Sequence, residues 1–182
     1  LVRKDTGWPP KTLLMERISG REVVNSNVIW DDTSSVVSET RVPELDLTEV
    51  HPLDDRMKVN VLDPYSAVLR LLNQIEKTGD CTSSYEIYDG RRRSRIYFEK
   101  IGKIVLEQDR PGVFTGSAMV CDVKFDPIGG HRINSKWRSN KDQNGRVKVF
   151  FARPLESQVM PVRIEVKSWI GKIIGRLDLR QM

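Results

Sequence analysis

The chain has 182 residues, of which 38% are hydrophobic and 30% charged, and it carries a formal net charge of +5 at pH 7. This length fits one domain better than two, and no stretch approaches the roughly 18 consecutive apolar residues of a membrane-spanning helix. We therefore expect a single β domain over residues 1–182. The charges are interspersed along the expected strands, and the basic-aromatic signatures of RNA-binding modules are missing, so we expect no nucleic-acid partner.

The first part of the chain predicts two strands and an irregular segment. Residues 13–18 and 22–30 have strand character on either side of a turn at Gly20–Arg21. Two prolines interrupt residues 36–61, for which we expect an extended, irregular path.

One α-helix is expected over residues of about 64–77. Asp63 is a good N-cap, and Pro64 suits the first helical position. Apolar residues then recur at helical spacing up to Ile75, and Gly79 is a plausible stop.

After the helix the apolar pattern changes to period two. It predicts strands over residues 83–88, 92–100, 104–108, 115–125, 146–152, 162–167 and 172–180. Asp89–Gly90 is a strong hairpin signal, Gly102 permits a tight bend, and the segment 127–130 ends the long strand before it.

Consecutive hairpins of this kind predict a mainly β fold. Strands twist, so a long antiparallel meander curls and tends to hide its edges. We therefore expect a curved antiparallel meander that forms an open barrel or a β-spiral wrapped on the one helix. A sandwich of two sheets is the competing architecture.

The two cysteines favour a disulfide. Cys81 lies at the junction of helix and strand, and Cys121 lies on the apolar face of a strand, 40 positions later. Only two histidines accompany them, too few soft ligands for a metal, and an inward-facing Cys121 argues against a reactive thiol. Two inert buried thiols and a redox or catalytic cysteine are the alternatives.

Two basic segments are candidate anion-binding sites. Arg91, Arg93 and Arg95 fall on one side of the expected strand and could contact phosphate or an acidic partner, although such charges also protect sheet edges. His131 and Arg132 follow two glycines in a loop that could bind an anion, and a polar turn is the alternative.

No residue pattern indicates catalysis. The chain has no Gly-rich phosphate loop and no nucleophile elbow. Asp54, Asp55 and His131 could serve an enzyme only if they converged in one cleft, which a sequence does not show. We therefore expect no catalytic residues, no metal and no cofactor.

Several segments, in this order, are similar to one known family. They are Arg41–Val42–Pro43, Asp63–Pro64–Tyr65–Ser66–Ala67, the run 88–93, the run 98–102, Gly116–Cys121, the run 127–131, and Pro161–Ile164 followed by Gly171. Over residues 11–180 the chain resembles a proteobacterial family of secreted envelope proteins known only as a domain of unknown function.

The resemblance implies a periplasmic location, a signal peptide and further N-terminal strands outside the given sequence, and a paired Cys81 and Cys121. It also implies a curved sheet wrapped on a helix, as in β-spiral envelope-integrity proteins and, more distantly, lipoprotein carriers. It transfers no catalytic residue.

The function expected from these features is non-enzymatic. We expect a periplasmic envelope protein that binds a protein partner or a hydrophobic ligand, because a curved sheet offers a groove for ligands and an open edge for strand addition. A lipid or lipoprotein carrier of half-barrel type and an enzyme that modifies envelope polymers are the alternatives.

Overall fold

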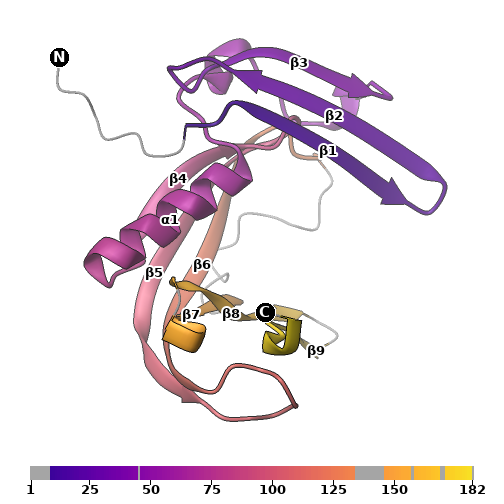
Figure 1. Cartoon of the computed structure of the whole chain (residues 1–182). Helices are drawn as coiled ribbons and strands as arrows, with labels where there is room; N and C mark the ends of the chain where they lie inside the picture. Colours follow the sequence, from indigo (N-terminus) through magenta and orange to yellow (C-terminus); the bar gives the residue numbers. More distant parts are fainter. Residues whose placement is uncertain (1–8, 45, 134–145, 157, 169–170, 182) are drawn as a thin grey trace, which may run out of the picture. The chain divides into compact units, whose positions relative to one another are not determined.

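The computed structural model describes residues 9–44, 46–133, 146–156, 158–168 and 171–181 (Figure 1). Its main elements are nine strands and one helix: β1 Thr12–Ser19, β2 Glu22–Trp30, β3 Val36–Val42, α1 Pro64–Thr78, β4 Ser83–Tyr88, β5 Arg93–Leu106, β6 Gly116–Gly129, β7 Val147–Ala152, β8 Met160–Ser168 and β9 Gly171–Arg176. The predicted mainly β class with a single α-helix is confirmed for the described residues.

The described residues divide into two compact units. The first unit takes its residues from Leu1–Arg70, Tyr85–Arg95 and Asp126–Ser139, and the second from Leu71–Ser84, Ile96–Phe125 and Asn140–Met182. The expectation of one domain over the whole chain stays a prediction.

A three-stranded antiparallel sheet in the first unit has the order β1-β2-β3. The turn between β1 and β2 needs the positive φ of 61° that Gly20 supplies without strain. One side of the sheet contributes Leu13, Val28 and Trp30 to a buried cluster that also includes Tyr88. The strand β3 corrects the expected irregular path, because residues 36–42 pair with β2 although most of their side chains are exposed.

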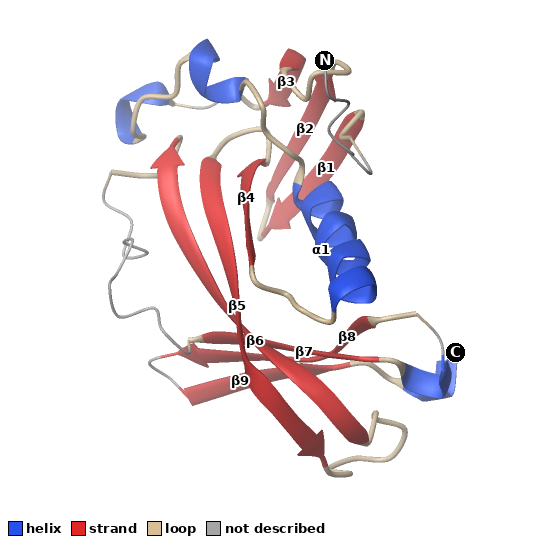
Figure 2. Ribbon diagram, turned by 90° about the vertical axis from the view of Figure 1, so that its left-hand side faces the viewer, coloured by secondary structure: helices blue, strands red, loops and turns tan. Residues whose placement is uncertain are grey.

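The second sheet has the order β4-β5-β6-β7-β8-β9, with every strand next to its neighbour in sequence, so the predicted antiparallel meander is present. Figure 2 shows β7, β8 and β9 side by side. Residues 93–106 form one continuous strand, so the expected bend at Gly102 is wrong, although that glycine does take a φ of 146°. The strand β6 likewise continues through Pro127 to Gly129.

Helix α1 begins and ends where its capping residues place it. The Asp63 carboxylate oxygen Oδ1 accepts hydrogen bonds from the backbone N–H groups of Tyr65 (2.8 Å) and Ser66 (3.0 Å). Gly79, with a φ of 66°, donates its N–H to the carbonyl of Ile75 at 2.8 Å and ends the helix. The buried residues Ala67, Leu71 and Ile75 are four apart and lie on one helical face.

No helix among the described residues has the length and apolar character needed to cross a membrane.

The cap of α1 gives a first prediction. Asp63→Ala removes the acceptor for two N–H groups of the first helical turn, so it should lower the free energy of unfolding by about 1 kcal/mol in urea denaturation. Asp63→Asn keeps an acceptor oxygen and should stay close to the native value. An unchanged unfolding midpoint in Asp63→Ala would contradict this account of the helix start.

Candidate ligand-binding site

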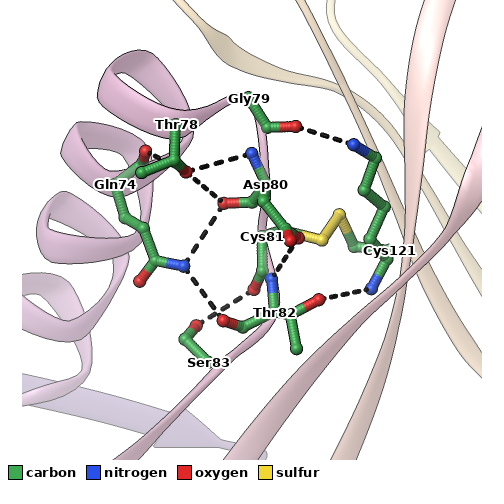
Figure 3. Close-up of a disulfide and its surroundings, with 9 residues drawn as sticks. Gln74, Thr78, Gly79, Asp80, Cys81, Thr82, Ser83 and Cys121 are labelled. Carbon is green, nitrogen blue, oxygen red and sulfur yellow. Dashed lines mark hydrogen bonds between the residues drawn. A yellow bond between two sulfur atoms is a disulfide. The ribbon is translucent and has the colours of Figure 1, made fainter.

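A disulfide joins the segment after α1 to the middle of β6. Cys81 and Cys121 have a Cα–Cα distance of 6.5 Å, and both side chains are fully buried (Figure 3). They are the only two cysteines of the chain, and neither is free. The predicted disulfide is confirmed, and the alternatives of inert thiols or a redox thiol are excluded for this structure.

Hydrogen bonds fix the same segment from two sides. The Gln74 amide on α1 donates to the carbonyls of Asp80 (3.3 Å) and Thr82 (3.0 Å). From β5, the Lys100 ammonium donates to the carbonyl of Gly79 at 2.8 Å, and the Lys100 N–H donates to the Thr82 hydroxyl at 3.3 Å. The backbone that leaves the helix is therefore bonded to α1, to β5 and, through sulfur, to β6.

An open pocket of 510 Å³ lies beside this helix exit, inside the second unit. Its apolar lining consists of Ile75 on α1, Phe114 before β6, Met119 on β6, Phe151 and Ala152 on β7, and Val159 before β8. Met119 and Phe151 face each other across the β6–β7 pair, and Met119 lies two residues before Cys121. The disulfide thus holds the helix close to the strand that supplies the pocket floor.

Polar groups surround this apolar lining. The Glu76 carboxylate pairs with the Arg153 guanidinium at 2.6 Å and accepts the Val159 N–H at 3.3 Å, so it ties the residues on either side of 154–158 to α1. Both charged side chains are about half exposed, so their pairing adds little stability and chiefly positions the rim. Lys103 also lines the pocket, is exposed, and pairs with no carboxylate of the described residues.

The residues of the predicted basic stripe differ in their partners. Arg93 and Arg95 on β5 both donate to the Glu86 carboxylate on β4, one to each oxygen. Arg93 also donates to the carbonyl of Met57 at 2.6 Å. These hydrogen bonds lower the pKa of Glu86 against the opposing effect of its burial. Both guanidinium groups are therefore already engaged with an acid.

Arg91 is not on the strand with them. It lies in the turn between β4 and β5, where Asp89 Oδ1 accepts the N–H groups of Arg91 (3.1 Å) and Arg92 (2.7 Å). The Arg92 side chain also pairs with Asp89, whereas Arg91 has no ion-pair partner among the described residues. Arg132 is exposed and likewise has none.

His131 is half-buried, and its Nε2 lies 3.1 Å from both the Arg93 carbonyl and the Ser94 hydroxyl. Burial lowers the pKa of His131, and the nearby Arg92 and Arg91 act in the same direction, while the hydrogen bond to the Arg93 carbonyl opposes them. A neutral ring that donates from Nε2 to that carbonyl fits this setting.

The predicted acidic candidates are occupied elsewhere. Asp54 accepts hydrogen bonds from the Arg56 side chain at 2.8 Å and the Met57 N–H at 3.2 Å, and Asp55 pairs with Lys58 at 3.2 Å. The bond from Arg56 lowers the pKa of Asp54. No hydrogen bond or ion pair of the described residues joins these carboxylates to His131.

A family model described as a protein of unknown function (DUF3108) matches residues 10–179. The chain belongs to the DUF3108 family. The expected membership in a domain-of-unknown-function family is confirmed, and the proteobacterial and envelope assignments stay predictions. No curated protein and no solved structure matches this DUF3108 chain.

The disulfide of this DUF3108 protein gives a second prediction. Replacing both cysteines by alanine (Cys81→Ala, Cys121→Ala) opens a loop of 40 residues, which on the chain-entropy model costs about 4 kcal/mol. Guanidinium denaturation should show this loss in the double variant. The native protein kept under reducing conditions is the control and should lose a similar amount; an unchanged midpoint in both would contradict the structural role of the bond.

Proposed function

We propose that this protein is a non-enzymatic binding protein of the periplasm or another oxidising compartment, and that its pocket holds an amphiphile with an apolar chain and an anionic head. The observation that carries the proposal is the pocket beside the disulfide. It has an apolar floor, and at its rim lies Lys103, an ammonium group that pairs with no carboxylate of the described residues.

The cysteine chemistry supports the proposed compartment. Disulfides persist in oxidising compartments and are rare where glutathione and thioredoxin keep thiols reduced. The bond between Cys81 and Cys121 is fully buried and joins two segments that shape the pocket, so it supports a protein whose working form is the oxidised one.

The apolar part of the ligand follows from the pocket floor. Ligand pockets commonly have volumes of about 300–1,000 Å³ and are lined mostly by hydrophobic and aromatic groups with a few polar ones. The volume of 510 Å³ falls in this range. The half-buried Phe114 offers an apolar surface that an acyl chain can cover, beside the exposed edges of the largely buried Met119 and Phe151.

The charge of the head group follows from the rim. Glu76 is neutralised by Arg153, so the pocket has no free carboxylate among its described lining residues. Lys103 remains as an exposed ammonium group beside the apolar floor. A carboxylate or phosphate head on an acyl chain would pair with it while the chain lies on the floor.

The test is a fluorescence titration of the oxidised protein with dansylated undecanoic acid. Ser117→Trp places a large ring in the pocket from an exposed position, so it should abolish the blue shift and intensity gain of the bound probe without disturbing the core. Thr40→Trp, on an exposed position of β3, is the matched control and should bind like the native protein.

Charge reversal tests the head group separately. Lys103→Glu should weaken binding of the anionic probe by roughly tenfold, since it replaces a charge-assisted hydrogen bond by repulsion. Lys167→Glu makes the same change in net charge on an exposed position of β8 outside the pocket lining and should leave binding unchanged. No binding by the native protein, or equal binding by native and Ser117→Trp protein, would refute the proposal.

A further inference from the structure

Three arginines that are far apart in the sequence meet in the first unit. Arg41 on β3 pairs in register with Ser26 on β2, and its Nη1 donates to the Ser26 hydroxyl at 3.3 Å. Gly90 packs against the same place, because a Cβ on Gly90 would lie 3.6 Å from the Ser26 Cβ. The turn that contains Arg91 is therefore next to Arg41.

The loop that contains Arg132 lies against this turn. A Cβ on Gly130 would overlap the carbonyl oxygen of Arg91, so the two backbones are in direct contact. Two hydrogen bonds hold the loop there: the Gly130 N–H donates to the His51 carbonyl at 3.0 Å, and the His51 N–H donates to the His131 carbonyl at 2.8 Å. Arg132 follows directly and forms a β-bridge with Val50.

The acids near these arginines already have other partners. Asp89 binds the Arg92 side chain through two nitrogens, at 2.9 and 2.6 Å. Glu39 pairs with the Lys58 ammonium at 2.5 Å and accepts the Tyr88 hydroxyl. Neither carboxylate is within ion-pair distance of the three arginines.

Two buried donors in this arginine cluster are unsatisfied. The Nε atoms of Arg41 and Arg91 are buried and have no hydrogen-bond partner among the residues that the structure describes. Burial lowers the pKa of Arg91, the charges of Arg92, Arg132 and Arg41 lower it further, and the charge of Asp89 opposes them. Buried guanidinium donors without a partner are costly, and the mutual repulsion of like charges adds to that cost. An anion at this place would remove both penalties.

We propose that Arg41, Arg91 and Arg132 form a binding site for a phosphate group. Guanidinium groups bind oxyanions through two parallel N–H bonds. Three positive charges that pair with no acid of the described residues match a phosphomonoester dianion better than a single carboxylate. The site is separate from the pocket of the second unit, so its test does not depend on the amphiphile.

The experiment is calorimetric titration of the whole oxidised chain with inorganic phosphate and with glycerol 3-phosphate at constant ionic strength, together with flotation of phosphatidylcholine vesicles with and without phosphatidic acid. Binding of the soluble phosphates identifies a free phosphorylated compound as the ligand. Binding only to vesicles with phosphatidic acid identifies a lipid phosphate headgroup. Either result supports the site, provided that the variants below behave as stated.

Arg132→Gln should weaken phosphate binding roughly tenfold or more, because it removes a charge-assisted contact from an exposed position. Arg21→Gln is the matched control. It removes an exposed arginine in the turn before β2 that pairs with no acid of the described residues, and it should bind like the native protein.

The unfolding temperature gives a second readout, which does not require measuring the affinity for phosphate. In sodium chloride, Arg132→Gln should unfold at the native temperature or higher, since repulsion between the arginines falls. In phosphate of equal ionic strength, the native protein should gain more stability than the variant. No binding of any phosphate, equal weakening by Arg21→Gln, or equal stabilisation of Arg132→Gln by phosphate would overturn the proposal.

Discussion

The bond between Cys81 and Cys121 attaches the segment that follows α1 to the strand β6 in the second unit. Closing this loop contributes about 4 kcal/mol on the chain-entropy model, a large share of the 5–15 kcal/mol that typically separates folded from unfolded proteins. Hydrogen bonds from Gln74 and Lys100 to backbone carbonyls of the same segment hold its orientation in addition to the covalent link. Ile75 and Met119 meet at the pocket because this junction is held.

Two sets of arginines in the first unit differ in whether an acid compensates their charge. Arg93 and Arg95 share Glu86 and help to join β4 and β5. Arg41, Arg91 and Arg132 form no ion pair with an acid of the described residues, although Asp89 and Glu39 are near. A net charge of +5 does not reveal this difference, because it depends on which acid each guanidinium group reaches in the folded chain.

Local signals were enough to predict most strands, the helix and the cysteine pair. Asp63, Pro64 and Gly79 act through backbone groups within a few residues, so their effect is visible in the sequence. The strand β3 was missed because its segment is mostly polar and exposed, and only pairing with β2 makes it extended.

The candidate sites depend on contacts between distant segments. Arg41 comes close to Arg91 because Arg41 hydrogen-bonds to Ser26 and Gly90 packs against Ser26. No sequence pattern around residue 41 indicates that proximity. Lys103 and Ser117 lie on different strands and share a pocket only after β5, β6 and α1 have assembled. Residue type and spacing therefore identified the basic residues Arg91, Arg93 and Arg95 as candidates and Cys121 as inward-facing. The turn position of Arg91 and the partners of each side chain came from the fold.

We propose that the disulfide shapes a pocket that holds an anionic amphiphile. Native mass spectrometry of the oxidised protein, isolated from the cells that make it, tests this most directly. The account predicts a bound species with the mass of an acyl-chain anion, which is released when the disulfide is reduced. Repeated preparations that show only the bare oxidised chain, or a bound species that reduction does not release, would contradict it.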